Sequence, residues 1–299
     1  MSGVKGLVLR RRVLGYFFLI PTVTLLCTLN FYPIINSIIM SFTNWTGFTN
    51  NYKWVGIANF KHVLFNMPEY WKAMSVGVRF ALISTTIQTI LGFFLGVLVI
   101  SLSTKLQNFY KVAIYMPVIL PSAVVALLWR MIYTPDFGIL NQMLRAIGLS
   151  SWTRAWTGDP NWALASVIFT NTWRYVGFTT VLYFVSFLGI DKEMIESSMM
   201  DGCSGFGRIR HFYFPLTRGT TEINYLLSLT GGLRAFDMFY LLTHGGPGTT
   251  TRVIGILVLN EGFRAFRFGR TLAMSLVLFV VVSIAAIITR LVLAPRDDY

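Results

Sequence analysis

Long uncharged stretches separated by short polar segments dominate the pattern of this chain. The uncharged runs cover residues 13–52, 80–104, 112–129, 175–190 and 271–289. Most of them approach or exceed the roughly 18–20 residues that a helix needs to cross the hydrocarbon core of a bilayer. We therefore predict an all-α membrane protein with six transmembrane helices. The predicted spans are residues 13–40, 76–102, 112–133, 163–189, 220–243 and 271–293, of which the fifth is the most polar.

Composition supports the membrane class. Hydrophobic residues make up 55% of the 299 residues and charged residues only 12%, so the chain has more apolar surface than a soluble domain of this length buries.

The distribution of Lys and Arg predicts the orientation of these spans. With the N terminus inside, twelve basic residues fall in inner segments and nine in outer loops that are longer in total. Basic residues in short loops stay on the cytoplasmic side, so we expect both termini inside. The organisation is then an inner segment, the first span, an external loop, a five-span core and an inner tail. Their bounds are 1–12, 13–40, 41–75, 76–293 (with the inner loop 191–218) and 294–299.

Neither the net charge nor the motifs indicate nucleic acid or catalysis. The net charge is +13, but the basic residues lie scattered at span ends rather than in an aromatic-lined groove, which fits membrane lipid and not nucleic acid. A phosphate-binding G-x-x-x-x-G-K-[ST] motif does not occur, and the glycine-rich segment 244–248 lacks its lysine. His211 and His244 lie in predicted loops, and His62 has no His, Cys or carboxylate at ligand spacing. We expect no enzyme, no catalytic residue and no metal site, and we interpret segment 244–248 as a turn, with contact to a partner as the alternative.

Polar side chains within the fourth span suggest a binding face. Asn171, Arg174, Tyr175 and Phe178 follow i, i+3, i+4, i+7 spacing, so they share one side of a helix. A polar group at bilayer depth is costly unless it meets a protein partner or a wet cavity. Amide and guanidinium groups suit sugar hydroxyls, and aromatic rings suit the apolar face of a pyranose. The alternatives are an interhelical hydrogen bond for Asn171 and snorkelling towards the outer interface for Arg174.

The fifth span carries a second face of small and polar residues, namely Ser228, Gly231, Gly232, Ala235 and Asp237. It either lines a cavity or packs closely against another helix, with Arg234 and Asp237 neutralising each other at i, i+3. Pro117 and Pro121 in the third span predict a kink that frees backbone carbonyls.

The inner loop after the fourth span predicts two short helices. Asp191 is placed to cap the first, with Glu193 in its opening turn. Gly202 is placed to end it in a left-handed conformation, and Pro215 to stop the second.

This loop also carries a resemblance to a known family. Its pattern resembles the cytoplasmic signature loop of the permease subunits of ATP-binding-cassette (ABC) importers, with two serines in place of two alanines and with Phe212 and Phe214 before the proline. Residues 14–293 resemble the maltose-type sugar permeases, with supporting segments at 41–45, 133–141, 236–251 and 266–279. The residues that match the signature are Glu196, Ser197, Ser198, Asp201, Gly202 and Pro215.

The resemblance implies the type I ABC importer permease fold, in which the matching loop residues couple transport to an ATPase. Asn171, Ser228 and Gly232 match positions of the sugar pathway in that family, whereas Arg174 and Tyr175 stand where smaller or apolar residues occur there, so the preferred sugar is expected to differ. The implied partners are a second, homologous permease subunit, a cytoplasmic ABC ATPase dimer that binds ATP and Mg²⁺, and an extracytoplasmic sugar-binding protein. The implied location is the cytoplasmic membrane of a bacterium or archaeon.

An ion-coupled secondary transporter of small polar solutes is the alternative from another class. It requires paired interrupted helices and intramembrane carboxylates in two repeated halves. We find no such repeat, and the available acids, Glu222 and Asp237, lie in one span.

Overall fold

The computed structural model describes residue 17, residues 19–49 and residues 51–294. Within these residues the secondary structure is helical apart from one isolated antiparallel bridge between Thr43 and Trp54, which confirms the all-α class. The predicted inner segment 1–12, the first residues of the first predicted span and tail residues 295–299 lie outside the described residues.

The chain divides into two compact units. Unit 1 comprises residues 1–66 and 258–277, and unit 2 comprises residues 67–257 and 278–299. The elements of unit 1 are η1 (Cys27–Phe31), α2 (Tyr32–Met40), α3 (Ala58–Phe65), η4 (Asn260–Arg264) and the first part of α15 (Phe268–Leu293). Those of unit 2 are α4 (Pro68–Ile100), α5 (Thr104–Ile119), α6 (Ser122–Ile132), α7 (Ile139–Ala146), η2 (Ser150–Trp152), α8 (Ala163–Leu188), α9 (Lys192–Met200), α10 (Gly205–Arg208), η3 (Ile209–Tyr213), α11 (Phe214–Leu216), α12 (Arg218–Leu233), α13 (Asp237–Thr243), most of α14 (Ile254–Leu259) and the end of α15.

Three helical stretches among the described residues are long and apolar enough to cross a membrane, namely Leu19–Met40, Pro68–Ile100 and Phe268–Leu293. Two bent pairs, α5 with α6 and α8 with α9, raise the number to five if each is one span. The helix of the fourth predicted span, α8, has nearly the predicted bounds, whereas α4 begins eight residues before the second predicted span.

The fifth predicted span, residues 220–243, is not one helix. It consists of α12 and α13, separated by Arg234–Phe236. Gly231 and Gly232 precede the break, and paired glycines weaken a helix because they lose the most backbone freedom on ordering.

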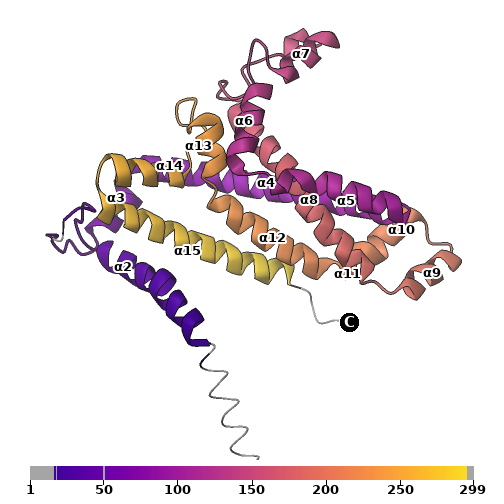
Figure 1. Cartoon of the computed structure of the whole chain (residues 1–299), viewed down its shortest axis with the longest axis horizontal. Helices are drawn as coiled ribbons and strands as arrows, with labels where there is room; N and C mark the ends of the chain where they lie inside the picture. Colours follow the sequence, from indigo (N-terminus) through magenta and orange to yellow (C-terminus); the bar gives the residue numbers. More distant parts are fainter. Residues whose placement is uncertain (1–16, 18, 50, 295–299) are drawn as a thin grey trace, which may run out of the picture. The chain divides into compact units, whose positions relative to one another are not determined.

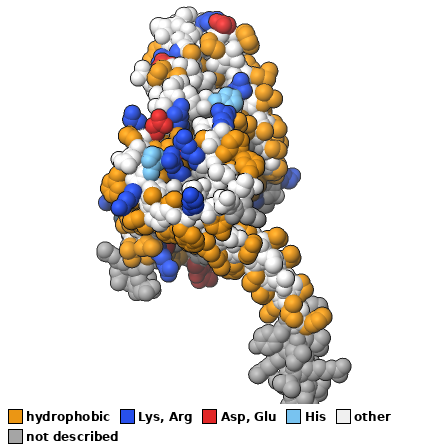
Figure 2. All heavy atoms as spheres, turned by 90° about the vertical axis from the view of Figure 1, so that its left-hand side faces the viewer, with side chains coloured by type: hydrophobic (Ala, Val, Ile, Leu, Met, Phe, Trp, Pro, Cys, Tyr) orange, Lys and Arg blue, Asp and Glu red, His pale blue; other side chains and the backbone are white. Residues whose placement is uncertain are grey.

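The helix of the first predicted span keeps hydrophobic side chains on its surface. Figure 2 shows them along the slender segment that leads to the undescribed N terminus. Leu19, Leu25, Leu29 and Ile35 are all more than half exposed. Such an outward apolar surface is expected of a helix whose solvent is lipid.

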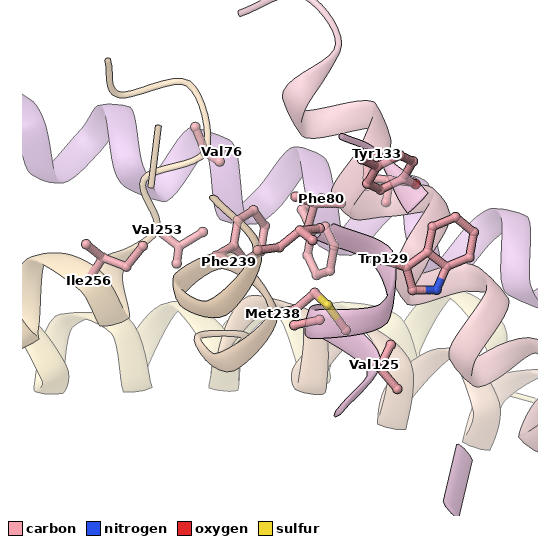
Figure 3. Packing of buried hydrophobic residues seen from close by; sticks show 13 residues of the cluster. Val76, Phe80, Val125, Trp129, Tyr133, Met238, Phe239, Val253 and Ile256 are labelled. Carbon is pink, nitrogen blue, oxygen red and sulfur yellow. The ribbon is translucent and has the colours of Figure 1, made fainter. Parts of the chain in front are cut away.

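The core of unit 2 is built on α4, which packs along α8 and α12. Small residues permit this close approach: Gly92 on α4 faces Thr179 on α8, and Gly232 on α12 faces Ala81 on α4. Figure 3 shows buried side chains of α4, α6 and α13 meeting nearby, where the rings of Phe80 and Phe239 lie 4.7 Å apart.

Unit 1 holds the external loop predicted at residues 41–75 as far as Asn66. Asn59 on α3 donates hydrogen bonds of 2.8 Å to the carbonyl oxygens of Ser41 and Thr43. Glu261 on η4 forms ion pairs with Arg267 (3.5 Å) and Arg270 (3.4 Å). The loop and the start of α15 are therefore ordered by contacts within their own unit.

Within unit 2, the short elements lie at two separate ends. Figure 1 shows α9, α10 and α11 at one end and α6, α7 and α13 towards the other, with α4, α8 and α12 running between them.

Candidate functional site

Unit 2 contains a cavity of about 620 Å³, within the roughly 300–1,000 Å³ range of small-molecule sites. Residues of α4, α5, α6, α8, α12 and α13 and of the α12–α13 break line it. They are Phe80, Ser84, Thr85, Gln88, Tyr115, Val118, Ser122, Asn171, Arg174, Tyr175, Phe178, Leu227, Ser228, Gly231, Gly232, Arg234, Ala235, Phe236, Asp237 and Met238.

The structure brings together the two sets of residues predicted to bind sugar. The face of α8 formed by Asn171, Arg174, Tyr175 and Phe178 lines the cavity, and so do Ser228 and Gly232 from α12. The helical spacing of the first set is confirmed, because all four lie in the continuous helix α8. Their contact with a ligand stays a prediction.

The side-chain amide of Asn171 is available inside the cavity. Asn171 is half-buried, and its backbone carbonyl oxygen accepts a hydrogen bond of 3.4 Å from Nε2 of Gln88. Its side chain forms no hydrogen bond with any described residue. The interhelical hydrogen bond of Asn171 in the described chain is thus made by its backbone, and its amide keeps its donors and its acceptor for another partner.

Arg174 is held against the break between α5 and α6. Its Nη1 donates to Oγ of Ser122 and its Nη2 to the carbonyl oxygen of Leu120, both at 3.0 Å. The guanidinium also lies over the ring of Tyr175, with Cζ 5.0 Å from the ring centroid. Arg174 therefore lines the cavity, and its snorkelling towards the outer interface stays an alternative prediction.

The kink predicted in the third span explains why the carbonyl oxygen of Leu120 can accept a hydrogen bond from Arg174. Helices α5 and α6 meet at 95° where Leu120 and Pro121 interrupt them. Because the backbone is extended at Leu120 and Pro121, the Leu120 carbonyl lies outside the hydrogen-bonding pattern of both helices and is open to Arg174. Pro117 lies inside α5 and not at the break.

One of the two alternatives for this segment included a pairing between Arg234 and Asp237, which the described residues do not form. The predicted i, i+3 contact required one continuous helix, whereas the chain leaves α12 at Arg234 and enters α13 at Asp237. Nε of Arg234 instead donates 3.2 Å to the carbonyl oxygen of Thr230. Both side chains are exposed and line the cavity, while Gly232 of the same face packs closely against Ala81 on α4, so the segment has features of both predicted alternatives.

Several cavity residues were not predicted. Ser84, Thr85 and Gln88 come from α4, Tyr115 from α5 and Ser122 from α6. A signal was present, because Gln88 is the one amide within the uncharged run 80–104 and Ser84 precedes it by four residues.

Asn224 forms a buried polar network beside the cavity. This fully buried residue of α12 donates 2.9 Å to Oγ1 of Thr89 on α4 and accepts 3.1 Å from Oγ1 of Thr179 on α8. Its amide thereby connects α12 to both α4 and α8 by hydrogen bonds. Asn171 and Asn224 thus differ in role, because only Asn224 has its amide engaged by other helices.

The segment between α8 and α12, residues 191–217, contains the predicted caps. Oδ1 of Asp191 accepts a hydrogen bond of 3.0 Å from the backbone N–H of Glu193 at the start of α9. Gly202 is left-handed, with φ +74°. The backbone N–H of Cys203 donates 2.9 Å to the carbonyl oxygen of Ser198, which completes the Schellman motif that ends α9.

Pro215 does not stop the second helix, contrary to the prediction. The chain stays helical from Gly205 through α10, η3 and α11 to Leu216. Residues Ile209–Tyr213 form a π turn, in which the N–H of Phe214 bonds to the carbonyl oxygen of Ile209. The wider turn moves the preceding carbonyls off α-helical register, so the proline that follows is accommodated.

The six residues that match the loop signature differ in exposure. Glu196, Ser197, Asp201 and Gly202 are exposed and Pro215 is half-buried. Ser198 is buried and donates 2.6 Å to the carbonyl oxygen of Ile195. Exposed apolar side chains accompany them, including Met200 and Phe206.

Aromatic side chains attach this segment to the cavity helices. The ring centroid of Tyr213 lies 5.0 Å from that of Phe187 on α8, and the ring centroid of Phe214 lies 6.1 Å from that of Phe93 on α4. At the start of α12, directly after this segment, Oγ1 of Thr220 donates a hydrogen bond of 2.8 Å to Oγ of Ser186 on α8. A displacement of residues 191–217 therefore acts on the helices that carry Asn171 and Gln88.

The glycine-rich segment after α13 is a turn, as predicted. His244 and Gly245 are left-handed, with φ of +52° and +85°, and Gly248 has φ +59°. Only residues tolerant of positive φ can reverse the chain in this way without strain.

Known proteins resemble the chain over most of its length. The chain is 32% identical to the probable ABC transporter permease protein YurN of Bacillus subtilis, across 91% of this chain and 93% of that protein. It is 28% identical to the trehalose/maltose transport system permease protein MalF of Thermococcus litoralis, across 91% of each chain. A solved structure of a bacterial alginate ABC transporter, bound to a periplasmic protein that holds an alginate pentasaccharide, has a chain with a similar fold. That chain is 21% identical, with a TM-score of 0.82 and 94% of each chain covered.

A family model described as "binding-protein-dependent transport system inner membrane component" matches residues 88–296. This match includes the C-terminal part of α4 from Gln88, α8, the whole segment 191–217 and α12 to α15. The chain therefore belongs to the family of inner-membrane permease components of binding-protein-dependent ABC transport systems.

Proposed function

We propose that this chain forms half of the translocation pathway of an ATP-driven sugar importer and carries an oligosaccharide or a sugar derivative. The observation that carries the proposal is that all six residues predicted to contact sugar line one cavity of suitable size. Asn171 supplies a free amide for hydroxyl groups and Phe178 an apolar ring. Family membership and the sugar-transporting relatives add support.

The proposed complex contains a homologous second permease, a cytoplasmic ABC ATPase dimer and an extracytoplasmic sugar-binding protein. ATP and Mg²⁺ are expected on the ATPase subunits. We also propose six spans with both termini in the cytoplasm, in which α12 and α13 together form the fifth. Segment 191–217 then faces the ATPase, which its position at the end of unit 2 away from α13 supports (Figure 1).

Coupling follows from how this segment is attached. Closure of the ATPase dimer displaces α9, with Glu196 at its exposed surface, and the contacts of Tyr213 with Phe187 and of Phe214 with Phe93 transmit the displacement to α8 and α4. These helices tilt as units because small-residue contacts pack them together. The cavity then opens alternately to either side.

Uptake of labelled oligosaccharide into proteoliposomes tests this proposal. The complex that co-purifies with the tagged chain is reconstituted with ATP inside or outside. We expect uptake that requires ATP hydrolysis and survives collapse of the proton and sodium gradients. Uptake that stops with the gradient and continues without ATP would instead support the ion-coupled transporter, which the family relationship does not favour.

A further inference from the structure

Three ionised side chains line the cavity: Arg174, Arg234 and Asp237. Their formal charges leave the cavity with a net charge of +1. We propose that the cavity selects sugars that carry an oxyanion, either a carboxylate or a phosphate ester. This inference rests on the proposed function of the cavity as a sugar pathway and names the class of sugar.

Arg174 keeps its charge uncompensated. Its two hydrogen bonds go to neutral oxygens, Oγ of Ser122 and the carbonyl oxygen of Leu120. The described residues place no carboxylate within ion-pair distance of this guanidinium. A guanidinium has five N–H donors, two of which are used here, and its buried Nε–H has no acceptor. The second N–H of Nη1, the second N–H of Nη2 and the full positive charge therefore remain for a ligand.

Asp237 does not neutralise either arginine. The break between α12 and α13 separates it from Arg234, and neither arginine forms an ion pair with it in the described chain. Glu261 in unit 1, by contrast, pairs with both Arg267 and Arg270. The cavity thus presents separate positive and negative groups, with the positive ones in excess.

The placement of Arg174 favours an oxyanion over a hydroxyl group. Hydrogen bonds from guanidinium to carboxylate or phosphate are roughly twice as strong as those between neutral groups, and low dielectric at membrane depth strengthens them further. The ring of Tyr175 and the two fixed bonds hold the guanidinium in one orientation, so little side-chain freedom is lost on binding. Hydroxyl groups of the same ligand are served by Asn171 and Ser228.

Protection of a cavity cysteine measures this preference without depending on what the binding protein selects. The reporter is Ser228→Cys in a background with Cys27→Ser and Cys203→Ser, within the full complex in lipid nanodiscs. A small neutral maleimide labels the cysteine in the presence of trigalacturonate or galactotriose. A second arm compares glucose 6-phosphate with glucose and with inorganic phosphate, which separates the two sources of oxyanion.

We expect the anionic sugar in at least one arm to protect at a concentration roughly tenfold lower than its neutral counterpart, as the loss of one charge-assisted hydrogen bond implies. Arg174→Gln should abolish this difference, and Arg234→Gln should reduce it. Arg130→Gln removes an exposed charge of α6 that does not line the cavity and should change nothing.

Equal protection by neutral and anionic sugars would overturn the inference and leave the sugar pathway intact. Persistence of the preference in both cavity variants would overturn it too. Protection by inorganic phosphate as strong as by glucose 6-phosphate would show that the cavity binds the oxyanion alone, and would overturn the selection of an anionic sugar. A cysteine that no sugar protects, or that does not react at all, would contradict the proposed function itself.

Discussion

Nη2 of Arg174 on α8 donates a hydrogen bond of 3.0 Å to the carbonyl oxygen of Leu120, the residue at which α5 ends. A cation of one predicted span is thereby joined to the kink of another. The same guanidinium bonds to Ser122 on the far side of the kink, so it connects α5, α6 and α8. The side chain that gives the cavity a positive charge is therefore also the one that connects the two helices at the kink.

Ser122→Ala tests this arrangement. The substitution removes one acceptor of Arg174, and we expect a loss of stability on the order of 1 kcal/mol, seen as a lower melting temperature of the purified complex. Ser122→Thr keeps a hydroxyl group at the same position and should retain most of the stability. Equal melting temperatures for the two variants would show that the hydroxyl does not hold Arg174.

Gly177 tests the packing of α8 against α5. A Cβ at this position would overlap the carbonyl oxygen of Ile114. Gly177→Ala should therefore force the helices apart and cost roughly 1–3 kcal/mol, measured by thermal unfolding.

Gly77→Ala provides a matched control. Gly77 also lies inside a helix, but a Cβ there would meet nothing within 4 Å. Alanine has the higher helix propensity, so this variant should be stabilised by roughly 0.5–1 kcal/mol. If Gly177→Ala were as stable as Gly77→Ala, the close approach of α5 and α8 would be wrong.

Local chemistry made the caps and α8 predictable. A carboxylate before a helix and a glycine after it act through their own backbone neighbours, so Asp191 and Gly202 needed no knowledge of the fold. The bounds of α8 followed from a long apolar run. The shared face of Asn171 and Arg174 then followed from helical spacing alone.

Features that depend on distant contacts were missed or mispredicted. The carbonyl that Arg174 binds belongs to a kink 54 residues away, and Gln88 enters the cavity because α4 packs on α8. The π turn before Pro215 is a choice between similar helical geometries, and the break at Arg234 follows a glycine pair that weakens the helix without fixing where it ends. Spacing on an assumed straight helix therefore gave a false pair between Arg234 and Asp237.

Gly202→Val tests the coupling role of segment 191–217. Gly202 has φ +74°, and a β-branched side chain is strained there by about 1–2 kcal/mol. We expect α9 to lose its ordered end, with weaker ATPase association and slower uptake. Co-purification of the ATPase measures the first effect directly.

Gly202→Asn is the control for this variant, because asparagine tolerates the left-handed region. It should retain more ATPase and more uptake than the valine variant. Normal recruitment and uptake in Gly202→Val would contradict the role assigned to the end of α9.

Asn171→Ala tests the cavity face. Its amide has no partner among the described residues, so its removal should leave the melting temperature of the complex unchanged. Loss of one hydrogen bond to a ligand costs about 0.5–1.5 kcal/mol. We therefore expect the apparent affinity for sugar in the transport assay to fall roughly threefold to tenfold, while ATP hydrolysis continues.

Asn224→Ala is the matched control, since the same amide is lost from a fully buried position of α12. Thr89 and Thr179 would each lose a hydrogen-bond partner, and the hydroxyl of Thr179, which is fully buried, would be left unsatisfied at a cost of roughly 1–3 kcal/mol. This variant should lower the melting temperature, with any loss of uptake following the loss of assembled complex. The opposite pattern, a destabilised Asn171→Ala complex and a stable Asn224→Ala complex with weakened sugar affinity, would move the sugar contact from α8 to the interior face of α12.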